Sequence, residues 1–108
     1  MTLPTVGELE LAVLLTVARF EGEAYGTSVR RELAARTGRD HALGAIYTTL
    51  QRIENKGLVV STMSEPAAVR GGRAKRCFRT TALGSRVIRD ARNVKNALWK
   101  GIPTWSTA

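Results

Sequence analysis

One stretch of the sequence, residues 42–56, carries side chains whose types and spacing suit contact with DNA bases. If it is helical, Ile46, Leu50 and Ile53 share one apolar face, because they are four and three residues apart. The opposite face then carries small or polar residues: Gly44, Thr48, Gln51, Arg52 and Asn55. Gln can pair with adenine, Arg with guanine, and Thr can contact a thymine methyl or a phosphate. An ordinary solvated helix face is the alternative interpretation.

Positive charge gathers after this stretch. Residues 65–80 contain five cations, Arg70, Arg73, Lys75, Arg76 and Arg79, and no acidic residue follows Glu65 among them. Such a basic hairpin could lie along phosphates or place a guanidinium in a narrow minor groove. A hairpin that is basic only for solubility is the alternative, but cations without an acid between them repel one another unless they meet an anion.

The charge of the whole chain supports the same interpretation. The 108 residues carry a net charge of +8, from 17 basic and 9 acidic residues. Residues 70–108 hold ten of the basic residues and one acid, Asp90, whereas residues 1–69 are nearly neutral. A basic half beside a neutral half is typical of proteins that bind nucleic acid.

Periodicity predicts the elements that must position these side chains. The expected order is helix, helix, helix, strand, strand, helix, a mainly α protein with a small β-hairpin (α+β), which is the winged helix-turn-helix arrangement. Thr5 is expected to cap the first helix, Gly38 to end the second, and Thr81 to cap the last. The predicted segments are helices over 6–20, 25–37, 42–56 and 82–100, strands over 58–64 and 75–80, and a loop over 65–72.

The chain is expected to form a DNA-binding domain over residues 1–81, a dimerisation helix over 82–102 and a frayed tail over 103–108. Cys77 is the only cysteine, which excludes an internal disulfide and a zinc site built from several thiolates. No signal peptide and no run of about 20 apolar residues is visible, so we expect a cytoplasmic location without membrane association. We find no pairing of a nucleophile with a base and no metal-ligand cluster, so neither catalysis nor a cofactor is expected.

Several short motifs lie in the predicted helices: Leu9-Glu10, Val13-Leu14, Tyr25-Gly26, Gly44-Ala45-Ile46-Tyr47, Leu50, Arg52, Ile53-Glu54 and Gly57-Leu58. Others lie in the hairpin and beyond it: Gly71-Gly72-Arg73, Lys75-Arg76, Phe78, Thr81 and Gly84. In combination, these motifs over residues 7–84 resemble those of the PadR-like transcriptional regulators.

The resemblance implies a homodimer that binds a palindromic operator in double-stranded DNA, usually as a repressor. The third helix would enter the major groove, and we expect contacts from His41, Gly44, Ala45, Tyr47, Thr48, Gln51 and Arg52. The hairpin would contact flanking DNA, through Arg70, Arg73, Lys75 and Arg76. The last helix would pair with its counterpart, through Leu83, Val87, Ile88, Ala91, Val94, Leu98 and Trp99. Packing of this helix within its own chain is the alternative.

Some residues depart from the family pattern or admit two interpretations. His41 and Thr48 stand where the family commonly has Ser and Pro, which leaves the operator sequence open. Tyr47 would donate to a phosphate or pack half-buried, and Cys77 is expected to be a packed residue rather than a redox sensor. Some short members stack flat ligands on a tryptophan; Lys95 takes that position here, and Trp99, one turn later, would stack an aromatic effector or only pack at the dimer contact.

Two other functions remain open from the sequence alone. A basic winged helix could bind RNA, although single-stranded RNA usually requires stacking aromatics, and the third helix offers only Tyr47. A winged helix could also bind a protein partner, but Arg52 and the hairpin arginines argue against that use.

Overall fold

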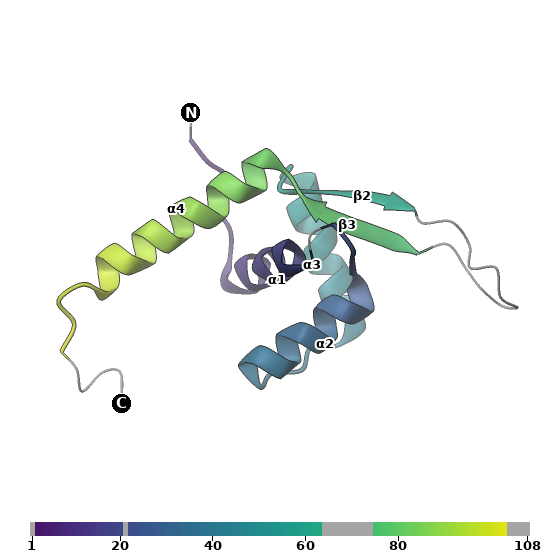
Figure 1. Cartoon of the computed structure of the whole chain (residues 1–108), viewed down its shortest axis with the longest axis horizontal. Coiled ribbons are helices and arrows are strands. Elements are labelled where there is room, and N and C mark those ends of the chain that lie inside the picture. The colour runs from purple at the N-terminus through teal and green to yellow at the C-terminus, as the bar shows by residue number, and fades with distance from the viewer. Residues whose placement is uncertain (1, 21, 64–74, 104–108) are drawn as a thin grey trace, which may run out of the picture.

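The computed structural model describes residues 2–20, 22–63 and 75–103. These residues form four helices and three short strands, so the expected α+β class with its helix, helix, helix, hairpin, helix order is confirmed (Figure 1). The predicted loop over 65–72 and the tail from Thr104 lie outside the described residues. The elements are α1 (Glu8–Arg19), β1 (Ala24–Tyr25), α2 (Gly26–Thr37), α3 (Leu43–Asn55), β2 (Val59–Met63), β3 (Arg76–Thr80) and α4 (Ala82–Trp99).

The sheet contains one strand more than the predicted hairpin. Its antiparallel order is β1-β3-β2, with Phe78 at the centre, opposite Ala24 on one side and Ser61 on the other. The sequence did not reveal β1, because two residues are too few to show an alternation of apolar and polar positions. This strand ties the start of α2 to the base of the hairpin.

The core lies between α1, α2, α3 and the inner face of the sheet. Ile46, Leu50 and Ile53 are fully buried, which confirms the predicted apolar face of α3. Phe78 covers them from the sheet and is buried as well. The other buried apolar residues are Val13, Leu14, Val17, Ala24, Val29, Leu33, Leu58, Val59 and Val87.

The start of α1 differs from the prediction. Thr5 does not cap the helix; Gly7 is the N-cap, and its amide donates to Glu10 Oε1 at 2.7 Å. Glu10 also pairs with Lys56 Nζ at 2.9 Å, and Lys56 donates to the carbonyl of Thr5 at 2.7 Å. The Gly7 amide, followed by Lys56, holds the pKa of Glu10 below its usual value. This network fastens the N-terminal segment to the end of α3.

The helix-turn-helix connection is fixed by backbone geometry and one ion pair. Gly38 ends α2 in the left-handed conformation, with φ of 72°, as predicted for this position. Arg30 in α2 donates to both carboxylate oxygens of Asp40, at 2.9 and 3.0 Å. The Arg30 guanidinium thereby lowers the pKa of Asp40. The bidentate contact holds the connection against α2, which sets the start of α3.

The junction between β3 and α4 has no linker. Thr81 caps α4, as predicted, by accepting from the Gly84 amide at 3.0 Å. The Thr81 amide donates to the Leu58 carbonyl at 3.0 Å, and its hydroxyl donates to the Gly57 carbonyl at 2.6 Å. Gly84 lies so close that a Cβ there would overlap the Leu58 carbonyl oxygen and come 2.9 Å from Thr80 Cγ2.

The two halves of α4 have different environments. Val87 is only 3% exposed and belongs to the core of its own chain, which corrects the prediction that it faces a partner. Leu83 and Ile88 also pack against this core in part. The C-terminal half of the helix projects away from the body of the molecule (Figure 1). Among the described residues, none of the helices combines the length and apolar composition that a bilayer crossing requires.

Candidate nucleic-acid interface

The outward face of α3 consists of small and polar side chains. Gly44, Thr48, Gln51 and Asn55 are all exposed, while the opposite face of the helix is buried. A Cβ at Gly44 would meet nothing within 4 Å, so the backbone at the start of the helix is open to a close approach. This face has the size and chemistry that the major groove accepts.

Ala45 and Arg52 lie on the flank of α3 that turns toward α1. Both are exposed, and the charge of Arg52 contributes to lowering the pKa of Glu10 near the start of α1. Because an arginine side chain is long, its guanidinium at the edge of the helix can still reach a base or a phosphate.

Tyr47 lies on the other flank and rests on the first residue of α2. Its side chain is 41% exposed. A Cβ at Gly26 would come 2.7 Å from both Cε1 and the hydroxyl oxygen of Tyr47, so only glycine permits this contact. Gly26 is therefore needed for the position of the Tyr47 ring, and the hydroxyl lies beside the N-terminus of α2, where backbone amides favour an anion.

His41 is separate from this group of side chains. It is partly buried and lines a hollow of about 230 Å³ with residues of α1 and α2, among them Leu9, Ala12 and Leu33. In the part of the chain that the structure describes, no cluster of three or more His, Cys, Asp or Glu side chains could hold a metal ion.

The structure describes two of the four hairpin cations that are expected to contact DNA. Arg70 and Arg73 lie outside the described residues. Lys75 is exposed, with its ammonium 5.8 Å from the centre of the Tyr25 ring. Arg76 forms an ion pair with Glu54 of α3, so an acid from outside the hairpin balances one of its cations. Sequence analysis missed Glu54 as a partner because it lies 22 residues from Arg76 in the chain. The spacing of Arg76 and Phe78 could have indicated it, since residues two apart in a strand share a face and buried Phe78 faces the core.

Cys77 is a packed residue in β3. Its thiol is partly buried and lies 3.0 Å from the carbonyl oxygen of Gly22. This contact agrees with the prediction of a small packed side chain at this position.

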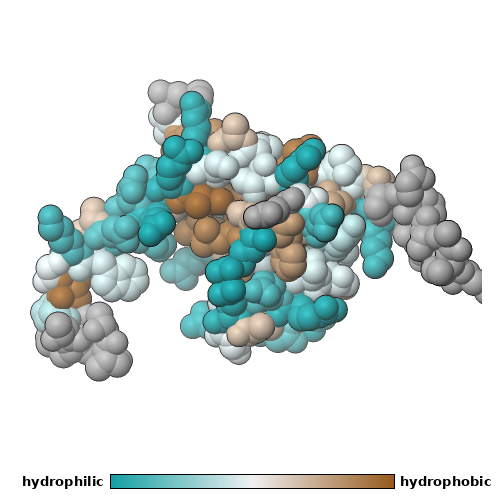
Figure 2. All heavy atoms as spheres, viewed as in Figure 1, coloured by the Kyte–Doolittle hydropathy of each residue, from teal (hydrophilic) through white to brown (hydrophobic). Residues whose placement is uncertain are grey.

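An apolar surface lies on the opposite side of the molecule from the hairpin. Figure 2 shows hydrophobic atoms gathered in the hollow between α4 and α1. Leu98 is 71% exposed and Trp99 61% exposed, values that are unusual for such large apolar side chains in an isolated chain. The other large exposed apolar residues here are Leu15, Val94 and Ile102. Sequence reasoning did not assign Leu15 or Ile102 to this surface.

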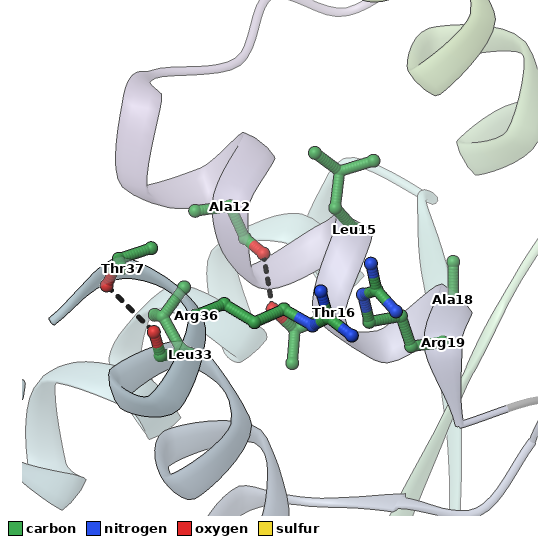
Figure 3. Close-up of a pocket in the computed structure, with 8 residues that line it drawn as sticks. All are labelled: Ala12, Leu15, Thr16, Ala18, Arg19, Leu33, Arg36 and Thr37. Atoms are coloured by element: carbon green, nitrogen blue, oxygen red, sulfur yellow. Dashed lines mark hydrogen bonds between the residues drawn. The ribbon is translucent and has the colours of Figure 1, made fainter. Parts of the chain in front are cut away.

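The apolar surface continues as grooves on both sides of α1. Between α1 and α4, a groove of about 420 Å³ is lined by Leu11, Leu15, Lys95 and Trp99, among others. Between α1 and α2, a second groove of about 460 Å³ shares Leu15 with the first (Figure 3). Its floor contains Ala12 and Leu33, and Arg36 reaches across it from α2. The exposed side of α1 therefore lacks a packing partner within the described residues.

Comparisons with known proteins agree with the geometry. The model of the transcriptional regulator PadR-like family matches residues 14–90, and a search of curated proteins found no significant match. A PadR family transcriptional regulator from Eggerthella lenta is 28% identical, with a TM-score of 0.68, over 86% of this chain and 82% of that one. A PadR-like transcription factor from Bacteroides fragilis is 18% identical, with a TM-score of 0.71, over 83% and 82% of the two chains. A PadR family regulator from Clostridium difficile is 19% identical, with a TM-score of 0.64, over 87% and 88%.

Proposed function

The chain belongs to the PadR-like family of transcriptional regulators, and on that basis we propose that it is a homodimeric repressor of a palindromic operator. It is a DNA-binding regulator and not an enzyme. The observation that carries the proposal is the division of α3 into a buried apolar face and an exposed face of Gly44, Thr48, Gln51 and Asn55. In this proposal α3 enters the major groove, and the hairpin follows the flanking phosphates.

The contacts to DNA divide into two classes. Thr48, Gln51 and Arg52 contact base edges, so they determine sequence preference. Gly44, Ala45 and Tyr47 lie where the backbone of the DNA passes α3, and Arg70, Arg73 and Lys75 extend the phosphate contacts along the hairpin. His41 lies apart from these residues, in the hollow beside α1.

The homodimer forms through the second half of α4. Ala91, Val94, Leu98 and Trp99 present an apolar strip, and the unpartnered side of α1 offers a complementary apolar surface at Leu15. Two chains related by a two-fold axis would bury both surfaces and place two copies of α3 on successive turns of DNA. Trp99 in the same groove is the position at which a flat aromatic effector would stack.

A selection from random DNA tests the proposal. We expect the protein to enrich one inverted-repeat sequence from a pool of random duplexes. It should bind that duplex with a Kd of roughly 10 nM, and a shuffled duplex at least about a thousand-fold more weakly. The logarithm of affinity should fall linearly with that of salt, because counterions leave the phosphates. Fluorescence anisotropy against salt measures both properties. Enrichment of no sequence, or tighter binding to RNA of the same length, would contradict the proposal.

Tyr47→Phe separates hydrogen bonding by the hydroxyl from packing of the ring. We expect affinity for selected and shuffled duplexes to fall alike, by roughly 30-fold, because the dimer loses one hydrogen bond to a phosphate in each protomer and each bond contributes about 1 kcal/mol. The salt dependence should not change, since no charge is removed. Tyr25→Phe is the matched control, because Tyr25 is the other tyrosine and lies in β1. Equal affinities for Tyr47→Phe and the wild-type protein would show that the hydroxyl makes no contact with DNA.

A further inference from the structure

Among the described residues of β3, Phe78 is the last buried apolar side chain toward the hairpin tip. Phe78 and Arg76 lie on the same face of β3, because side chains two residues apart in a strand point to the same side. Phe78 is buried in the core, whereas Arg76 is the next residue on that face toward the hairpin tip. On this face of β3, a contact that holds the outer hairpin against α3 must therefore be made at Arg76 or beyond it.

At this position a polar network takes over from the core. We call Glu54, Ser61 and Arg76 the Glu54 clamp. One Glu54 oxygen pairs with Arg76 Nη2, and the other accepts from the amide and the hydroxyl of Ser61, at 3.0 and 2.5 Å. Arg76 Nε donates to Ser61 Oγ at 2.9 Å, and its guanidinium lies 5.3 Å from the centre of the Phe78 ring. The clamp thus joins α3, β2 and β3 through one carboxylate.

The clamp extends to the exposed face of α3. Arg76 Nη1 donates to Gln51 Oε1 at 3.2 Å, and Gln51 Nε2 donates to Asn55 Oδ1 at 2.9 Å. Both ends of the Gln51 carboxamide are therefore engaged, and its orientation follows that of Arg76. A side chain whose rotamer is held in advance loses less entropy when it binds, which favours one arrangement at the DNA over others.

We propose that Glu54 is a positioning residue for sequence discrimination: it neutralises Arg76 and holds the hairpin and Gln51 in fixed relation to α3. This inference rests on the proposed function. With the clamp closed, α3 and the hairpin meet the DNA in one relative position, and a sequence that requires another position binds poorly. Without it, Arg76 becomes a free cation that attracts any phosphate backbone.

Glu54→Gln tests this inference. Both carboxylate oxygens accept hydrogen bonds, so an amide in either orientation turns its NH2 group toward a donor. Glu32→Gln is the matched control, because Glu32 pairs with Arg36 at 2.7 Å within α2, away from the hairpin. Each change raises the net charge by the same amount and frees one arginine. The DNA probes are the duplex enriched by the wild-type protein and a shuffled version of it.

We expect the ratio of the two affinities to fall about ten-fold in Glu54→Gln, since hydrogen bonds to charged groups change equilibrium constants by about that factor. Binding to the shuffled duplex should become more salt-dependent, with a slope steeper by up to about 1.8, because each protomer of the dimer frees one Arg76. Glu32→Gln should keep the wild-type ratio. The double variant Glu54→Gln/Arg76→Gln should have nearly the same ratio of affinities as Glu54→Gln alone, because the two residues act as one unit.

Three results would overturn the inference. One is a ratio in Glu54→Gln that matches that of Glu32→Gln. Another is an equal loss of affinity for both duplexes together with a lower melting temperature, which is the result of a purely structural role. The third is failure of the wild-type protein to enrich any sequence, which would remove the proposed function itself. Hydrogen exchange at the Ser61 amide checks that the clamp has opened in Glu54→Gln, because this amide donates to Glu54 in the wild-type protein.

Discussion

Gly84→Ala is expected to lower the free energy of unfolding by about 3 kcal/mol, because it forces a methyl group into a closely packed backbone contact. The new Cβ would overlap the carbonyl oxygen of Leu58 and lie 2.9 Å from Thr80 Cγ2. A backbone oxygen cannot rotate away as a side chain can. The start of α4 must therefore shift, and the hydrogen bond from the Thr81 amide to Leu58 must lengthen or break. Urea denaturation at one fixed protein concentration measures the loss, since the stability of a dimer depends on concentration.

Gly44→Ala is the matched control for this experiment. Gly44 is also in a helix, but a Cβ there meets nothing within 4 Å. The substitution should raise stability by up to about 1 kcal/mol, because alanine favours helix more than glycine does. The same variant should bind DNA less tightly if the backbone of α3 approaches a phosphate at this residue. Wild-type stability in Gly84→Ala would show that the contact with Leu58 is looser than described.

Leu98→Glu is expected to convert the proposed dimer to monomers and to weaken binding to the selected duplex by at least about a hundred-fold, because both half-sites must be bound at once. Leu98 is 71% exposed, so the change removes little packing from its own chain. In the dimer, however, a carboxylate would be buried in an apolar contact without a partner. Multi-angle light scattering measures the mass, and fluorescence anisotropy measures the affinity for the selected duplex.

Asn93→Glu adds the same charge to the same helix and is the control. Asn93 is exposed and lines neither of the grooves that contain Leu98 and Trp99. This variant should remain dimeric and lose little affinity. If Leu98→Glu also remains dimeric at micromolar concentration, then α4 does not form the interface and another surface must be sought.

The spacing of apolar residues and the positions of helix-ending residues predicted most of the helices and the hairpin, because these features depend on residues close together in the sequence. The spacing of Ile46, Leu50 and Ile53 gave α3 and its orientation, and Gly38 gave the end of α2. The start of α1 was placed wrongly at Thr5, since a cap depends on which residue can supply and accept bonds, here Gly7 with Glu10. Strand β1 could not be predicted, because its existence depends on a partner strand more than fifty residues later.

The interface was predicted less completely than the fold. The exposed face of α3 followed from the period of the helix alone. The pairing of Arg76 with Glu54 did not, since an ion pair between distant residues depends on how the hairpin is placed against α3. The inward position of Val87 was missed for a related reason: the apolar face of α4 serves the core in its first half and is exposed in its second half.

The cap at Thr81 has a mechanical consequence for the proposed dimer. The hairpin and α4 meet without flexible residues, and hydrogen bonds to Gly57 and Leu58 fix the joint next to the end of α3. Because this joint is rigid, a rotation of α4 at the dimer axis would turn the hairpin and α3 by the same angle. The separation of two half-sites would then be set by the angle at which two α4 helices cross. An effector that slightly changed that crossing angle would change the separation of the two α3 helices, so that they would no longer match successive turns of the DNA.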